Sequence, residues 1–198
     1  MVYYLRKFVY FFVFFILVYN LPNHKVNAKS EIVLGNKEAK ITIIEFASMT
    51  CVHCAEFHQN IFPKINEKYI KTGKVKFIFR HFPLDKQALF ASILIKCAPD
   101  DKHYDFIKLI FKTRAKWISR EEQFIQKLKN VGKMGGLAEN KIESCFKNET
   151  IVDEIIESSS MAEKKFNISS TPSFIINEKK YTAMSFEGFE KVLDNLIN

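Results

Sequence analysis

The sequence predicts an α/β protein whose central mixed β-sheet is flanked by helices and interrupted by an inserted all-helical subdomain. Two observations indicate this class. A strand–helix–strand succession occupies residues 41–82, and a strand–strand–helix succession occupies residues 173–196. Between them, residues 85–166 carry helical patterns and no convincing strand. Because 198 residues suit one domain better than two, we expect the two α/β halves to share one core.

The first half of the predicted core is a βαβ unit. A strand is expected at Ile41–Phe46, where apolar residues on both faces indicate a buried central strand. A helix is expected at residues 52–71, and Pro63 inside it predicts a kink about one turn earlier. The next strand, Val75–Phe82, ends at Pro83. This order predicts two parallel strands joined by a right-handed crossover.

The predicted insertion consists of helices joined by loops. The expected helices are Gln87–Cys97, Tyr104–Lys112, Arg120–Asn130, Ala138–Lys147 and Thr150–Lys165. Three glycines, Gly132, Gly135 and Gly136, predict a loop between the third and fourth of them.

The chain after residue 166 returns to an α/β pattern. A strand is expected at Ser173–Ile176, followed by a turn near Asn177–Lys179 and a short strand at Lys180–Thr182. The final helix is expected at Phe186–Leu196. Hydrophobic residues make up 47% of the chain, which is enough to bury a core without metal or disulfide support.

The first 28 residues have the features of an export signal. Two basic residues precede an uncharged apolar run at Phe8–Val18, and Val26-Asn27-Ala28 offers small or aliphatic side chains to a signal peptidase. The run is shorter than the roughly 20 apolar residues that span a membrane. We therefore expect residues 1–28 to be a signal peptide, with an uncleaved anchor as the alternative. Residues 29–198 should then work in the periplasm.

The charge pattern argues against nucleic-acid binding. The formal net charge is +8, but the basic residues are scattered among acidic ones and form no stripe. A nucleic-acid interface needs basic residues clustered on one face. We expect no nucleic-acid partner.

Cys51 and Cys54 stand where the first strand gives way to the first helix. A thiol at that junction faces unpaired backbone N–H groups and the positive end of the helix dipole, which both stabilise a thiolate. Cys54 should lie one turn deeper on the same face, close enough to form a redox-active disulfide with Cys51. We expect Cys51 to exchange with other sulfurs and Cys54 to resolve the mixed disulfide. His53, between them, is expected to favour the Cys51 thiolate.

Two other interpretations of this pair are weaker. A structural zinc site needs a second cysteine pair or suitably spaced histidines, and Cys97 and Cys145 do not form a second pair of that kind. A purely structural disulfide between Cys51 and Cys54 would close too short a loop to restrict the unfolded chain much. We expect no metal ion and no cofactor.

Cys97 and Cys145 both lie inside the predicted insertion. A bridge between them would close a loop of about 50 residues and stabilise the fold by roughly 3–4 kcal/mol. We expect a structural disulfide here. Two unpaired buried thiols are the alternative.

Two further features are placed to meet the cysteines. Glu45 is the one charged residue of an otherwise apolar strand, where a carboxyl is costly to bury unless it is protonated or paired. Such a group is a candidate proton acceptor during thiol exchange, and a solvent-facing side chain at a sheet edge is the alternative. Thr171-Pro172 directly precedes a predicted strand, where a cis X-Pro turn fits.

This order of motifs resembles the DsbA-like thioredoxin-fold oxidoreductases of bacteria. The resemblance is carried by residues 45–54 (EFASMTCVHC), 74–84 (KVKFIFRHFPL) and 171–174 (TPSF). It implies that Cys51 is the nucleophile, Cys54 its partner, Thr171-Pro172 the cis-proline loop beside them and Glu45 a buried acid. It also implies cysteine-containing exported proteins as substrates, which lie against the cis-proline loop, and a membrane reoxidant, DsbB.

The chain departs from the family pattern in two places. Val52 stands where the family often has proline, and glycines usual around the last hairpin are missing from residues 177–183. The sequence therefore leaves open whether the enzyme acts as an oxidase or as an isomerase or reductase. About a dozen residues separate Ala28 from the first predicted strand, which leaves no room for a dimerisation domain, so we expect a monomer. A non-enzymatic peptide-binding or metal-chaperone module is the third alternative.

Overall fold

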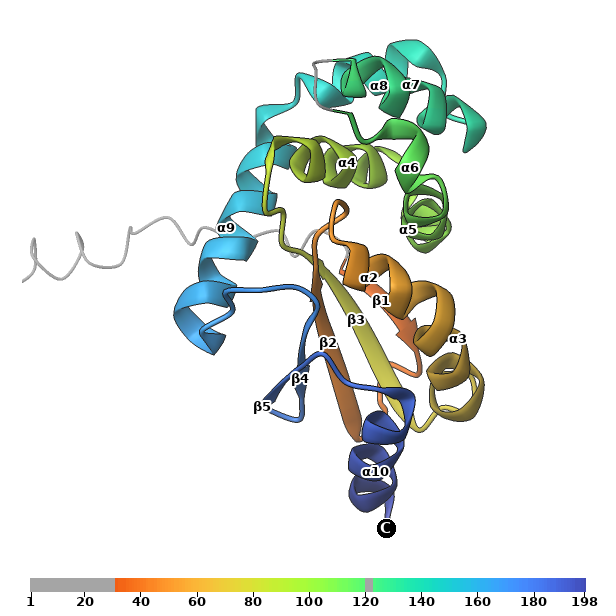
Figure 1. Cartoon of the computed structure of the whole chain (residues 1–198), viewed down its shortest axis with the longest axis vertical. Helices are drawn as coiled ribbons and strands as arrows, with labels where there is room; N and C mark the ends of the chain where they lie inside the picture. Colours follow the sequence, from red (N-terminus) through yellow and green to blue (C-terminus); the bar gives the residue numbers. More distant parts are fainter. Residues whose placement is uncertain (1–30, 120–122) are drawn as a thin grey trace, which may run out of the picture.

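The computed structural model describes residues 31–119 and 123–198. The predicted signal peptide at residues 1–28 lies outside these ranges, as do the first residues of the helix predicted at Arg120–Asn130. Five strands form one mixed sheet in the order β1-β3-β2-β4-β5, with helices on both sides (Figure 1). The strands are β1 (Ile32–Gly35), β2 (Ile41–Ala47), β3 (Val75–His81), β4 (Ser173–Ile176) and β5 (Lys179–Thr182). The predicted fold class is confirmed.

β2 lies at the centre of the sheet, as its apolar sequence predicts. It pairs in parallel with β3, from Ile41 opposite Val75 to Ala47 opposite His81, and antiparallel with β4. The outer pairs, β1 with β3 and β4 with β5, are antiparallel. The sequence analysis does not predict β1, a four-residue strand at the edge of the sheet.

One helical segment, residues 52–70, connects β2 to β3. It consists of α2 (Val52–Glu56), α3 (Phe62–Ile65) and two π-helical turns, η1 (Phe57–Ile61) and η2 (Asn66–Ile70). The turn η1 ends two residues before Pro63, which has no N–H to donate to the preceding turn. The irregularity is therefore where the proline predicts it.

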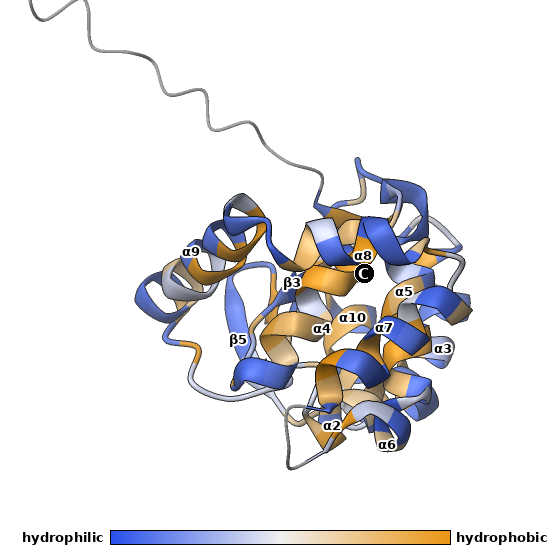
Figure 2. Cartoon of the chain, turned by 90° about the horizontal axis from the view of Figure 1, so that it is seen from above, coloured by the Kyte–Doolittle hydropathy of each residue, from blue (hydrophilic) through white to orange (hydrophobic). Residues whose placement is uncertain are grey.

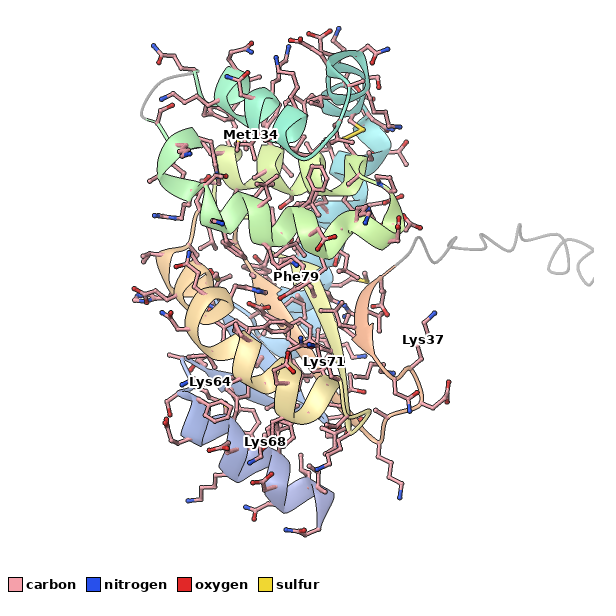
Figure 3. All side chains as sticks on the ribbon, turned by 90° about the vertical axis from the view of Figure 1, so that its right-hand side faces the viewer. Lys37, Lys64, Lys68, Lys71, Phe79 and Met134 are labelled. Carbon is pink, nitrogen blue, oxygen red and sulfur yellow. A yellow bond between two sulfur atoms is a disulfide. The ribbon has the colours of Figure 1, made fainter. Side chains whose placement is uncertain are left out.

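The two faces of the sheet carry different helices. α2, α3 and α10 (Phe186–Ile197) cover one face, and α9 (Glu149–Phe166) covers part of the other (Figure 1). Phe79 of β3 is buried under the α2–α3 segment, whereas Lys64, Lys68 and Lys71 lie on the outer side of that segment (Figure 3).

All the helices from α4 to α9 lie between β3 and β4 in the sequence, as the predicted insertion requires. Besides α9 they are α4 (Lys86–Cys97), α5 (His103–Lys112), α6 (Arg114–Trp117), α7 (Phe124–Met134) and α8 (Glu139–Phe146). α4 is buried on most sides and is largely hydrophobic in Figure 2. The four-residue helix α6 is not predicted, because one turn is too short to show a helical period.

Gly132 corrects the predicted loop. It lies inside α7, not in a connection. A Cβ atom there would come within 2.7 Å of Ile142 Cδ1 and 2.9 Å of Leu94 Cδ1. The glycine is therefore explained by the close packing of α7 against α8 and α4. Gly135 directly follows the helix, and Gly136 comes next with a positive φ.

A disulfide joins Cys97 at the end of α4 to Cys145 in α8, with Cα atoms 5.9 Å apart (Figure 3). Both cysteines are buried in a small apolar cluster with Ile93, Ile151 and Ile155. The bridge therefore ties α4 to α8 inside the insertion. In residues 31–119 and 123–198, no helix is both long and apolar enough to cross a membrane.

Candidate active site

Cys51 lies in extended backbone at the end of the β2 connection and caps the first turn of α2. Its Sγ accepts a hydrogen bond from the Cys54 N–H at 3.4 Å. The same sulfur donates to the Thr171 carbonyl at 3.2 Å. Cys51 is half-buried, so its sulfur can meet another protein while it stays in contact with the helix end.

Cys51 is unusually acidic. Its pKa is lowered from 9.0 to about 5, mainly by the hydrogen bond from the Cys54 side chain. Burial opposes this shift, and the Thr171 side chain and the backbone amides of Cys54 and His53 add to it. A thiol with this pKa is almost entirely ionised at neutral pH.

Cys54 has the opposite character. Its side chain has no exposed surface. Burial, the hydrogen bond with Cys51 and the negative charge of Glu45, in that order, raise its pKa far above the ordinary range. Both cysteines are free thiols in this structure, so it represents the reduced form of the predicted redox pair.

His53 differs from its predicted role. Its ring is largely exposed, and Nδ1 lies 3.1 Å from Glu56 Oε2. The imidazole is therefore turned toward Glu56 and not toward the sulfur. What His53 contributes to the acidity of Cys51 is its backbone amide. The reason is that this amide lies at the open end of the helix, where N–H groups lack partners.

Thr171 and Pro172 reach the cysteines because β4 pairs with β2. Ser173, the first residue of β4, lies opposite Phe46 near the end of β2. The preceding Thr171–Pro172 peptide bond is cis. The buried Thr171 hydroxyl has no hydrogen-bond partner among the described residues. The predicted loop is therefore beside the Cys51 sulfur.

Glu45 lies on β2 between β3 and β4, and its side chain has no exposed surface. The alternative of a solvent-facing edge residue is therefore wrong. Its Oε2 lies 2.9 Å from Nε2 of His58, and its Oε1 has no partner among the described residues. Sequence reasoning did not identify His58 as this partner. The available signal is that His58 follows Cys54 by four positions and so lies on the same helix face.

A second set of contacts, also not predicted, holds the residue before Cys51. Arg114 of α6 donates from Nε and a terminal nitrogen to the Thr50 carbonyl, at 2.9 and 2.7 Å. The Thr50 hydroxyl donates to Asp85 at 2.6 Å, and Asp85 also caps α4. The insertion therefore holds the strand-to-helix junction that carries Cys51.

Residues 31–119 and 123–198 contain no group of three or more His, Cys, Asp or Glu side chains placed to hold an ion. The buried histidine nearest the redox pair, His58, is engaged with Glu45.

Comparisons with known proteins agree with this geometry. A family model described as thioredoxin matches residues 27–195. A Rickettsia bellii protein, provisionally named a protein-disulfide oxidoreductase, is 33% identical over 170 residues, which cover 85% of this chain and 65% of that protein. This chain thus spans less than two thirds of that relative. Disulfide bond formation protein D of Bacillus subtilis is 27% identical over 184 residues, covering 85% of this chain and 76% of that one.

The similarity extends to solved structures. The crystal structure of alpha-DsbA1 from Wolbachia pipientis superposes with a TM-score of 0.79 at 34% identity, covering 89% of this chain and 92% of that one. The family match covers most of the sequence, and the fold carries a helical insertion in a thioredoxin-like core. The chain therefore belongs to the thioredoxin family, as one of its DsbA-like members.

Proposed function

We propose that the chain is an exported protein-disulfide oxidoreductase that oxidises dithiols of other proteins through Cys51 and Cys54. One observation carries the proposal: two thiols three positions apart are shifted in opposite directions, with the Cys51 pKa lowered to about 5 and the Cys54 pKa raised. An ionised, half-exposed sulfur exchanges readily with other sulfurs. A buried, neutral partner stays out of reach of substrates.

The direction of electron flow follows from the same asymmetry. Whatever stabilises the Cys51 thiolate stabilises the reduced enzyme, and a stable reduced form makes the disulfide a better oxidant. The names of the Rickettsia and Bacillus relatives support disulfide chemistry in the family. An isomerase or reductase has no comparable observation in its favour.

The proposed reaction has two exchange steps. A substrate thiolate attacks the Cys51 sulfur, the Cys51–Cys54 bond breaks, and Cys54 leaves and takes up a proton. A second substrate thiolate then attacks the substrate sulfur of the mixed disulfide, and Cys51 leaves as a thiolate. The substrate gains a disulfide, and the enzyme is left with two reduced cysteines. The substrate backbone is proposed to lie against the Thr171–Pro172 loop, because the Thr171 carbonyl lies 3.2 Å from the Cys51 sulfur.

The proposal includes a location and partners. The signal-like composition of residues 1–28 supports export to the periplasm. Exported cysteine-containing proteins are the proposed substrates, and a DsbB-like membrane protein is the proposed reoxidant. A monomer is the proposed state of the enzyme.

The deciding experiment is the reduction potential of the Cys51–Cys54 pair, measured in glutathione buffers, together with oxidation of a reduced unfolded protein. We expect a potential well above the roughly −270 mV of thioredoxin. We also expect rapid disulfide transfer, which the Cys51→Ser variant should lose. A thioredoxin-like potential with an ordinary Cys51 pKa would falsify the oxidase proposal. A dimer that repairs scrambled disulfides would point to an isomerase.

A further inference from the structure

The proposed chemistry requires a proton to move at Cys54 in every cycle. Cys54 leaves Cys51 as a thiolate when substrate is oxidised, and its raised pKa means that it must be protonated at once. When the enzyme is reoxidised, the same thiol must lose its proton before it can attack Cys51. Since Cys54 has no exposed surface, water cannot carry this proton directly. The proton has to pass through groups of the protein.

Glu45 is the first candidate to exchange that proton. It contacts His58, four positions after Cys54 on the same helical segment, and its negative charge contributes to the raised pKa of Cys54. Its side chain is fully buried as well, and Oε1 has no partner among the described residues. A proton on Glu45 would therefore still have no direct contact with solvent. A further group must connect Glu45 to solvent.

His58 makes that connection. Its Nε2 lies 2.9 Å from Glu45 Oε2, a normal hydrogen-bond distance. On the other side of the ring, Nδ1 lies 3.5 Å from the Tyr104 hydroxyl. Burial and the negative charge of Glu45 raise the pKa of Tyr104, so that hydroxyl stays neutral and can both accept and donate a hydrogen bond. The two ring nitrogens thus face different surroundings.

A cavity of about 410 Å³ beside His58 is lined by His58, Gln59, Phe111 and the two lysines Lys108 and Lys112. The imidazole itself is almost fully buried and stacks on the Phe111 ring, with centroids 4.9 Å apart. The charged and titratable groups that face it are Glu45 from β2 and Tyr104, Lys108 and Lys112 from α5.

We propose that His58 relays protons between Glu45 and the partly exposed Tyr104, and so sets the rate at which Cys54 can enter and leave the disulfide. The inference rests on the proposed function. During reoxidation Cys54 gives its proton to the Glu45 carboxylate and attacks Cys51. The Glu45 proton then passes to Nε2 of a neutral imidazole, which releases another from Nδ1 to the Tyr104 hydroxyl, and Tyr104 passes its own proton to solvent. During substrate oxidation the same path runs in reverse. His58 is a positioning and relay residue, because it acts through Glu45.

The test follows the two steps of oxidation separately. The reduced full-length protein is mixed with glutathione disulfide, acid-quenched at intervals and analysed by mass spectrometry. Appearance of the Cys51–glutathione adduct reports attack by Cys51, and its conversion to the intramolecular disulfide reports attack by Cys54. In His58→Gln, an amide can still hydrogen-bond Glu45 but cannot relay a proton. Adduct formation should be unchanged, and its conversion should slow at least about tenfold.

Chemical rescue separates a relay from a structural role. In His58→Ala the pocket should extend to Glu45, and added imidazole should restore the conversion step in proportion to its concentration. His103→Gln is the matched control, because His103 is also buried and its Nε2 contacts the Ala98 carbonyl at 3.0 Å and Asp100 at 3.7 Å, away from Glu45. Both of its steps should match the unaltered protein.

Two results would overturn the relay. One is conversion at the unaltered rate in His58→Gln. The other is an equal slowing of both steps in His58→Ala that imidazole does not relieve, which would make His58 purely structural. If the unaltered protein forms no adduct at Cys51, the proposed function fails and the relay with it.

Discussion

Replacing Thr171 by valine should make Cys51 a weaker acid. The Thr171 hydroxyl is buried without a partner among the described residues, and its carbonyl accepts from the Cys51 thiol at 3.2 Å. The same side chain lowers the pKa of Cys51, after the larger effect of the Cys54 side chain. The hydroxyl can therefore donate to the sulfur once the sulfur is ionised. Valine has the shape of threonine but no donor, so only the thiolate state loses a contact.

The expected size follows from the energy of one such contact. A hydrogen bond to a charged group contributes about 1.5–3 kcal/mol, and the half-exposed position of Cys51 favours the lower end. A loss of about 1.4 kcal/mol equals about one pKa unit, so the pKa of Cys51 should rise from about 5 to about 6. The same free energy should make the disulfide about 30 mV less oxidising.

Both quantities are measured on the purified protein, the pKa from the ultraviolet absorbance of the thiolate against pH and the potential in glutathione buffers. Disulfide exchange at pH 7 should change little, whereas near pH 5.5 the thiolate fraction should fall about threefold. Thr171→Ser keeps the hydroxyl and should stay near the unaltered pKa. The reasoning is refuted if valine leaves the pKa in place, or if serine shifts it as much as valine does.

Three further predictions concern stability. His81 is buried without a partner for either ring nitrogen among the described residues, and burial lowers its pKa from 6.5 to about 3. The unfolded chain therefore binds this proton and the folded chain does not, so stability falls as pH drops below 6.5. His81→Leu should remove about 2 kcal/mol of the loss between pH 7 and pH 5, which urea unfolding at both pH values would reveal. If the free energy of unfolding of His81→Leu depends on pH as it does in the unaltered protein, His81 is not the source of this loss. Replacing Cys97 and Cys145 together by alanine should lower the free energy of unfolding by about 4 kcal/mol through loop-closure entropy, while the Cys51 pKa, measured by thiolate absorbance, stays in place. Gly132→Ala should cost about 1–3 kcal/mol by overpacking α7 against α4 and α8. If urea unfolding shows the variant to be as stable as the parent, the contacts of α7 with α4 and α8 can move apart to make room for the added methyl group.

The central part of the fold can be predicted because its patterns are long. β2 and β3 contain seven residues each, β2 is apolar at all but two of them, and the segment between them repeats at helical spacing. β1 and α6 have four residues each and stand beside no motif that identifies them, whereas β4, which is equally short, is identified by the preceding Thr171-Pro172. Gly132 misleads for another reason. A glycine required by close packing inside a helix looks the same in sequence as a glycine in a loop.

The site divides in a similar way. Cys51, Cys54 and Thr171-Pro172 belong to local motifs, and their positions relative to the strands predict that they meet. Glu45 is recognisable because a charge interrupts an apolar strand. Its partner His58 is not, because the pairing joins a strand to a helix across 13 positions and depends on how the two pack. The hydrogen bond from Arg114 to the Thr50 carbonyl joins residues 64 positions apart, so no local sequence pattern predicts it.

The pairing of β2 with β4 also has a consequence for how the protein matures. These neighbours in the sheet are separated in sequence by the whole insertion, and contacts of such separation form slowly. A chain that emerges from its N-terminus exposes Cys51 well before Thr171 arrives beside it. Until β4 docks, Cys51 lacks the Thr171 contact that helps to lower its pKa. The pKa of Cys51 should therefore reach its lowest value only after β4 has paired with β2. Until then, a smaller fraction of Cys51 is ionised, and the new chain exchanges disulfides more slowly.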